Sequence, residues 1–189
     1  MTNWTDAHCH LQDEFLGDAH HADAARATLE RAFEAGVDRV VVIGTGEQTS
    51  REALAITGLA SPVEIFATVG LHPHDAKDGL DPIAELAREG HPKLVGIGEC
   101  GLDYFYEHSA RSEQRAVFAA QIGLAHELDL ALVIHARDAF EDLFKVLASE
   151  GVPAGRGCGS GGSLTGTGTA SRASSRRAAA RTARAREVA

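Results

Sequence analysis

The chain has 189 residues, 44% of them hydrophobic, which suits one globular domain with a sizeable core or a fragment of a larger protein. Its net charge of −9 is unevenly spread: residues 151–189 hold seven arginines and one acid, giving +6, so residues 1–150 carry −15. We find no secretory leader, no apolar run long enough to cross a bilayer, and three widely spaced cysteines, so we expect a cytoplasmic protein with no membrane contact and no disulfide-linked partner.

The first 150 residues alternate between short β-branched runs and longer helical patterns, which predicts successive βα units around a parallel sheet. We expect strands at residues 5–8, 39–43, 63–69, 93–98 and 131–135. We expect helices at residues 22–35, 48–59, 82–89, 112–128 and 138–150. Five such units fit either an open doubly wound sheet or an incomplete barrel with about five of eight units.

The end of the first expected strand carries two histidines. His8 and His10 are two residues apart, so in extended backbone they project to the same side, and Asp6 lies on that face as well. Imidazoles and a carboxylate in this pattern are typical ligands of a divalent metal. The pair alone is a weak signal in a chain with 10 histidines, and surface or core roles are the alternative.

The third and fourth expected strands also end in potential ligands. His72 and His74 flank Pro73 in a turn, and His72 is placed to face the same edge of the sheet as His8. Glu99 follows a glycine-rich stretch that permits close backbone approach, and a carboxylate there could bridge two metal ions.

The fifth expected strand is apolar and then delivers His135 and Arg137, which suit a metal and a phosphate respectively. Each residue alone has a structural alternative, a buried histidine or an arginine paired with an acid. The first strand is followed by no glycine-rich phosphate loop of the dinucleotide-binding type. Ligand-type residues at four strand ends therefore favour the TIM-type barrel, which places its active site at the carboxyl ends of its strands.

Four ordered segments, at residues 6–11, 69–74, 97–104 and 133–137, resemble the signature segments of the TatD-type metal-dependent hydrolases, which are deoxyribonuclease-like. The resemblance implies a TIM-type barrel with two divalent metal ions, Mg, Mn or Zn. It implies that His8 and His10 hold one ion, that Glu99 bridges both ions, and that His135 belongs to the other.

The resemblance also implies DNA or another phosphodiester as the substrate, with DNA processed from an end. It places His72 and Arg137 near the substrate, so that the expected catalytic residues are Glu99, Arg137 and His72. Asp103 lies in a motif without an assigned role. Chemically related metal sites hydrolyse esters and amides, so the residues leave the scissile bond open.

The sequence departs from the family pattern after Ala154. The family's later ligands, a histidine after a sixth strand and an aspartate after an eighth, have no counterpart, because residues 155–189 contain neither residue type. We expect a partial hydrolase barrel at residues 1–154 and a disordered basic tail at residues 155–189.

Two origins of the tail stay open. A C-terminal truncation or a frameshift near Pro153 would explain its abrupt start and predicts an impaired deoxyribonuclease. The alternative is a genuine arginine-rich arm that binds nucleic acid, in which case the chain would be a non-catalytic remnant.

Overall fold

The computed structural model describes residues 4–16 and 21–153, and the predicted tail at residues 155–189 lies outside them. Five strands alternate with helices along the chain. The strands are β1 (Trp4–Cys9), β2 (Val37–Val42), β3 (Glu64–Val69), β4 (Leu94–Asp103) and β5 (Ala131–Arg137). The helices are α1 (Asp13–Leu16), α2 (His21–Glu34), α3 (Glu47–Ile56), the 3₁₀ helix η1 (Pro73–Asp78), α4 (Asp81–Arg88), α5 (Arg111–Leu128) and α6 (Phe140–Glu150).

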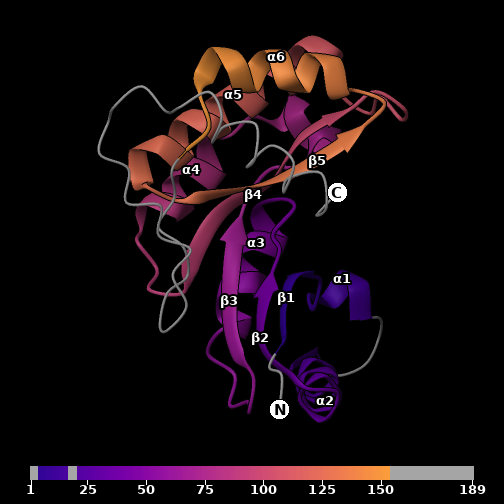
Figure 1. Cartoon of the computed structure of the whole chain (residues 1–189), viewed down its shortest axis with the longest axis vertical. Helices are drawn as coiled ribbons and strands as arrows, with labels where there is room; N and C mark the ends of the chain where they lie inside the picture. The colour runs from indigo at the N-terminus through magenta and orange to yellow at the C-terminus, as the bar shows by residue number, and fades with distance from the viewer. Residues whose placement is uncertain (1–3, 17–20, 154–189) are drawn as a thin grey trace.

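All five strands belong to one sheet, in the order β1-β2-β3-β4-β5, and every neighbouring pair is parallel. Strands that follow one another in the sequence therefore lie side by side, as in a (β/α) barrel. Figure 1 shows the sheet curling from β1 to β5, with helices between successive strands. The architecture confirms the predicted α/β class and the five units of an incomplete TIM-type barrel.

The expected elements are all present, and most bounds agree within three residues. Two short helices, α1 and η1, were not predicted, because neither spans enough residues to show a helical period. The larger difference concerns β4, which continues to Asp103 instead of ending at Gly98. Glycines mark strand ends more often than strand interiors. Here β5 supplies ladder partners as far as Asp103, so Glu99 lies inside a strand and not after it.

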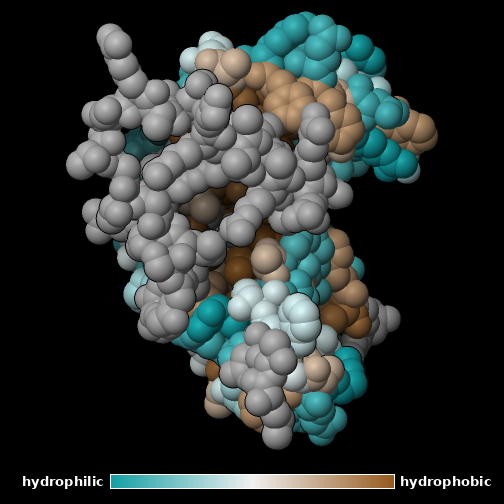
Figure 2. Space-filling model, in the orientation of Figure 1, coloured by the Kyte–Doolittle hydropathy of each residue, from teal (hydrophilic) through white to brown (hydrophobic). Residues whose placement is uncertain are grey.

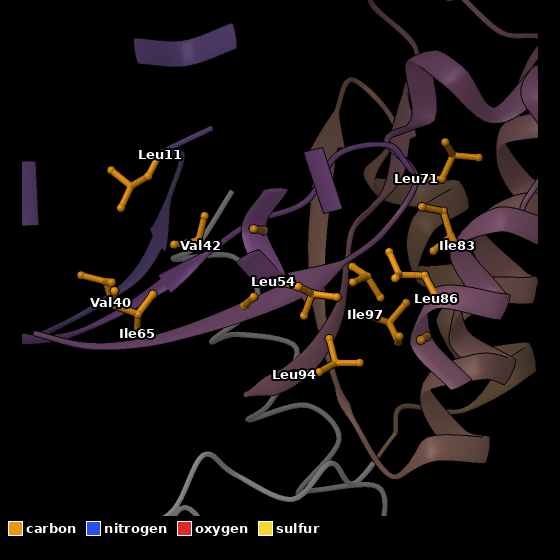
Figure 3. Close-up of a cluster of buried hydrophobic side chains, with 14 of the residues drawn as sticks. Leu11, Val40, Val42, Leu54, Ile65, Leu71, Ile83, Leu86, Leu94 and Ile97 are labelled. Carbon is orange, nitrogen blue, oxygen red and sulfur yellow. The ribbon is translucent and has the colours of Figure 1, made fainter. Parts of the chain in front are cut away.

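The core lies between the sheet and its helices. One cluster joins strands β1 to β4 with α2, α3 and α4. Figure 3 shows its leucines, isoleucines and valines on β2, β3, β4, α3 and α4. A second cluster joins β4 and β5 to α5 and α6, with Phe118, Ile122 and Leu143 buried in it. Phe118, Ile122 and Ala125 of α5 are spaced by three and four residues, so they lie on one face of the helix, and that face packs into the core.

The two outer strands are paired on one side each within the described part of the chain. Trp4 of β1 is 63% exposed, and Ala131 of β5 is exposed as well. Figure 2 shows hydrophobic residues at the surface in the middle of the face viewed in Figure 1. No helix among the described residues is long and apolar enough to span a membrane. Cys9 and Cys100 are both free thiols.

Candidate metal centre

The predicted ligands come together at the carboxyl ends of the strands. His8 and His10 lie at the end of β1, Glu99 lies in β4, and His135 lies in β5. The register places His135 beside Gly101 of β4, so that its side chain meets the strand that carries Glu99. Residues that are far apart in the sequence become neighbours because parallel strands end at one edge of the sheet.

The first cluster consists of His8, His10 and Glu99, whose ligand atoms lie within 4.8 Å of one another. The two Nε2 atoms are 3.3 Å apart, and Glu99 Oε2 lies 3.6 Å from that of His8 and 4.0 Å from that of His10. His10 Nδ1 lies 3.2 Å from the carbonyl oxygen of Ile43. In a neutral His10 ring, Nδ1–H donates to that carbonyl, which leaves the Nε2 lone pair directed at the cluster.

The second cluster shares Glu99 and adds His72 and His135, again with ligand atoms within 4.8 Å of one another. His135 Nδ1 lies 3.2 Å from Glu99 Oε1, and its Nε2 lies 3.1 Å from Asp103 Oδ2. A neutral ring whose Nε2–H donates to Asp103 directs its Nδ1 lone pair at Glu99, whereas the protonated ring donates to both carboxylates. Glu99 thus presents one oxygen to each cluster, the arrangement required of a carboxylate that bridges two cations.

Asp103 was quoted in a motif but given no role, and the structure places it beside the second cluster. It is 1% exposed, and its Oδ2 also lies 3.0 Å from His74 Nε2. Its Oδ1 accepts hydrogen bonds from the backbone N–H groups of Phe105 and Tyr106, each at 3.0 Å. Residues 99 and 103 project to the same face because both lie in β4, so this signal exists only once the strand is known to continue past Gly98.

Electrostatics keep both carboxylates ionised. Burial opposes the ionisation of Asp103, but hydrogen bonds from the Tyr106 N–H, His74, His135 and the Phe105 N–H outweigh it and lower its pKa to about 2. Burial likewise opposes the ionisation of Glu99, and the hydrogen bond from His135 lowers its pKa overall. The same two carboxylates overcome the effect of burial on His135 and raise its pKa.

Two of the cluster histidines, His10 and His72, have lowered pKa values. Burial lowers the pKa of His10, and the neighbouring His8 lowers it further. Burial, followed by the nearby His135, lowers the pKa of His72 to about 4. Neutral imidazole is the form that binds a metal, so the protein environment favours the required protonation state of His10 at neutral pH.

Glycines give Glu99 its position. A Cβ atom on Gly98 would overlap the carbonyl oxygen of Val133, and one on Gly101 would overlap that of His135. Both glycines have positive φ angles, 144° and 136°. Gly70 on the other side lies so close to Gly98 that a side chain there would overlap its backbone. The close backbone approach predicted around Glu99 is therefore present.

The two predicted substrate residues differ in their relation to the clusters. His72 belongs to the second cluster, with its ring centroid 4.5 Å from that of His135. Arg137 is exposed at the end of β5, and its guanidinium lies over the rings of Phe105 and Tyr106. The structure thus brings His8, His10, His72, Glu99 and His135 together, with Arg137 outside the two clusters.

The donor set fits divalent cations. Each cluster combines imidazole nitrogens with a carboxylate oxygen, a mixture that suits Zn²⁺ and Mn²⁺ and accepts other first-row metals. The hydrogen bonds of His10 to Ile43 and of His135 to Asp103 are those that ligating histidines generally make with their second nitrogen. The residues present therefore fit a metal centre.

A curled parallel sheet with histidines and a shared glutamate at its carboxyl edge defines a barrel-type protein with a potential metal centre. Residues 5–161 match the family model described as TatD related DNase. The chain belongs to this family.

Curated relatives and solved structures agree with that assignment. The chain is 36% identical over 151 residues to the uncharacterized metal-dependent hydrolase YabD of Bacillus subtilis, covering 79% of this chain and 56% of that protein. It is 37% identical over 123 residues to the 3'-5' ssDNA/RNA exonuclease TatD of Musicola paradisiaca, covering 64% and 46%. The TatD homolog YJJV of Escherichia coli superposes with a TM-score of 0.69 at 28% identity, covering 80% and 57%. The chain thus spans about half the length of these relatives.

Proposed function

We propose that this chain carries the divalent-metal site of a phosphodiesterase that acts on single-stranded nucleic acid. The observation that carries the proposal is that Glu99 presents one carboxylate oxygen to His8 and His10 and the other to His135. The substrate class is supported by a 37% identical relative named as a 3'-5' ssDNA/RNA exonuclease. Ester and amide hydrolases use similar metal sites, so the relatives and not the geometry favour phosphorus as the reacting centre.

When bound, divalent cations would lower the pKa of an attacking water and stabilise the phosphoryl oxygens. We propose that His8, His10, Glu99 and His135 hold two such ions, whose identity is Mg, Mn or Zn. The charge of Glu99 would offset part of the positive charge of bound ions, and the hydrogen bonds of His10 to Ile43 and of His135 to Asp103 would fix the rings so that their other nitrogens could bind.

His72 acts in the proposed reaction as a hydrogen-bond donor. Its Nδ1 accepts the His74 N–H at 3.3 Å, and its pKa of about 4 makes the ring neutral at pH 7. The proton of the neutral ring is then on Nε2, which can donate to a phosphoryl oxygen of the substrate. Arg137 supplies an exposed planar guanidinium next to the clusters, suited to a second phosphoryl oxygen.

We propose that the 189-residue chain binds metal but turns over substrate slowly, because residues 155–189 offer no histidine or aspartate as further ligands. The first test is the cleavage of a 5'-labelled single-stranded oligonucleotide by the 189-residue protein with Mn²⁺ or Mg²⁺. We expect slow metal-dependent shortening that Glu99→Gln reduces at least about 100-fold, because the shared ligand loses its charge. Glu89→Gln, an exposed glutamate at the end of α4, is the matched control and should cleave normally. Cleavage that persists in EDTA or in Glu99→Gln would refute the proposal.

A further inference from the structure

An exposed group of rings lies beside the metal centre. It consists of Phe105, Tyr106 and His108 from the loop between β4 and α5, together with Arg137 from the end of β5; we call these four residues the ring platform. Phe105 is 56% exposed and Tyr106 is 49% exposed. Burial of large aromatic side chains is energetically favourable, so a contiguous group of them that stays exposed is typical of a binding surface.

The platform side chains contact one another. The guanidinium of Arg137 lies 4.3 Å from the ring centroid of Phe105 and 4.7 Å from that of Tyr106. The Tyr106 and His108 rings are nearly parallel, with an interplanar angle of 7° and centroids 5.6 Å apart. Flat surfaces and a delocalised cation are thus presented together, which is the combination that stacks on nucleobases and pairs with phosphates.

The platform is continuous with the metal centre. The Tyr106 ring makes an edge contact with His74 at 5.6 Å, and the His74 ring lies 4.3 Å from His72 and 6.4 Å from His135. A base held on the platform would therefore belong to a nucleotide next to the phosphate at the two clusters.

The loop that carries the rings is held in place by hydrogen bonds. Asp103 Oδ1 accepts the N–H groups of Phe105 and Tyr106. Ser109 Oγ donates to the carbonyl of His74 at 2.7 Å and accepts the Lys77 N–H at 3.1 Å. A surface fixed before binding loses little conformational entropy when the ligand docks, so exposed rings on this loop can contribute to affinity.

Resting on the proposed function for its substrate, we propose that the ring platform stacks against the nucleobase beside the scissile phosphate and selects single strands over duplexes. Every nucleobase has a stacking face, so the contact tolerates any sequence. In a duplex those faces are covered by neighbouring pairs, and the platform has no access to them. Residues 1–150 carry a net charge of −15, so they do not attract nucleic acid at long range. Stacking on the ring platform supplies a short-range attraction instead.

The test measures binding without cleavage, by fluorescence anisotropy of 5'-fluorescein-labelled dT12 and an abasic oligomer of equal length in EDTA. We expect Phe105→Ala and Tyr106→Ala to raise the Kd for dT12 about 5- to 150-fold and to leave the abasic oligomer within about twofold. Tyr106→Phe keeps the ring and should restore binding. Phe33→Ala removes an equally exposed ring, 49%, at the far end of α2 and should change nothing.

Equal losses on dT12 and the abasic oligomer would overturn the proposal, as would equal affinity for single strands and duplexes. If the protein sediments as a dimer and Tyr106→Ala sediments as a monomer, the platform is a contact between copies of the chain, and the proposal is refuted as well. If the protein binds dT12 in a base-dependent way but does not cleave the oligonucleotide, only the proposed function is refuted. Cleavage with an unchanged KM for dT12 in Tyr106→Ala would refute the platform alone.

Discussion

At the scale of single residues, Asp103 links two parts of the molecule that the sequence keeps separate. One carboxylate oxygen accepts from His74 and His135, and the other holds the backbone of Phe105 and Tyr106. The orientation of a proposed metal ligand and the placement of the ring platform therefore depend on the same buried charge. A substitution that changes only one of the two carboxylate oxygens can therefore distinguish the effect on His135 from the effect on the loop.

We expect Asp103→Asn to weaken binding of the ion at His135 about 10- to 100-fold while the loop stays in place. The amide keeps an acceptor for the N–H groups of Phe105 and Tyr106, but its NH₂ group cannot accept a hydrogen bond from His135. Isothermal titration with Mn²⁺ measures the affinity, and dT12 anisotropy reports on the loop. Unchanged Mn²⁺ affinity would contradict the role of Asp103 in positioning His135.

At the scale of elements, the α5 helix anchors the loop beside the metal centre through one side chain. Gln114 is fully buried, and its Nε2 donates to the carbonyls of Asp103 and Ser109, both at 2.9 Å. Its Oε1 accepts the Asp103 N–H at 2.8 Å. The amide thus closes both ends of the loop that carries the exposed rings.

We expect Gln114→Leu to lower the free energy of unfolding by about 2–5 kcal/mol, because three buried backbone groups lose their partner, and to weaken dT12 binding because the loop loses its anchor. Gln121→Leu is a matched control: Gln121 is also fully buried and bonds both the N–H and the carbonyl of Leu71. It should cost a similar amount in chemical denaturation and leave dT12 binding unchanged. Equal effects of both substitutions on binding would count against the loop-specific role.

The elements also show what the sequence could and could not predict. The β-branched runs and helical spacing predicted every long strand and helix, since burial on one face leaves a period in the sequence. The extension of β4 past Gly98 was not predictable, because it depends on β5 as a partner. The same holds for the ring platform: Phe105 and Tyr106 have no periodic pattern, and their contact with Arg137 exists only once β4 and β5 pair.

At the scale of the whole molecule, the two clusters connect the ends of the sheet. His8 lies in outer strand β1 and His10 directly follows it, His135 lies in outer strand β5, and Glu99 lies on β4 between these two strands. Within the described residues these outer strands are each paired on one side, and unpaired strand edges promote association between chains. We expect the 189-residue protein without metal to unfold at low temperature and to associate in sedimentation at raised concentration. A soluble monomer with a sharp, high thermal transition would contradict this expectation.

Metal binding should stabilise this fold. Ions held by residues from β1, β4 and β5 would link the two outer strands, which are otherwise connected only through the strands between them. A ligand that binds the native state at 100 times its Kd adds about 2.7 kcal/mol, which corresponds to a rise in Tm of roughly 5–10 °C for a fold of this size. We expect that rise with Mn²⁺ in scanning calorimetry, and its reversal by EDTA. Glu99→Gln removes the charge shared by both clusters and should abolish most of the shift, whereas Glu89→Gln should keep it. The same rise in Glu99→Gln would mean that the stabilising ion binds elsewhere on the acidic body, and that the clusters at the strand ends are not the metal centre.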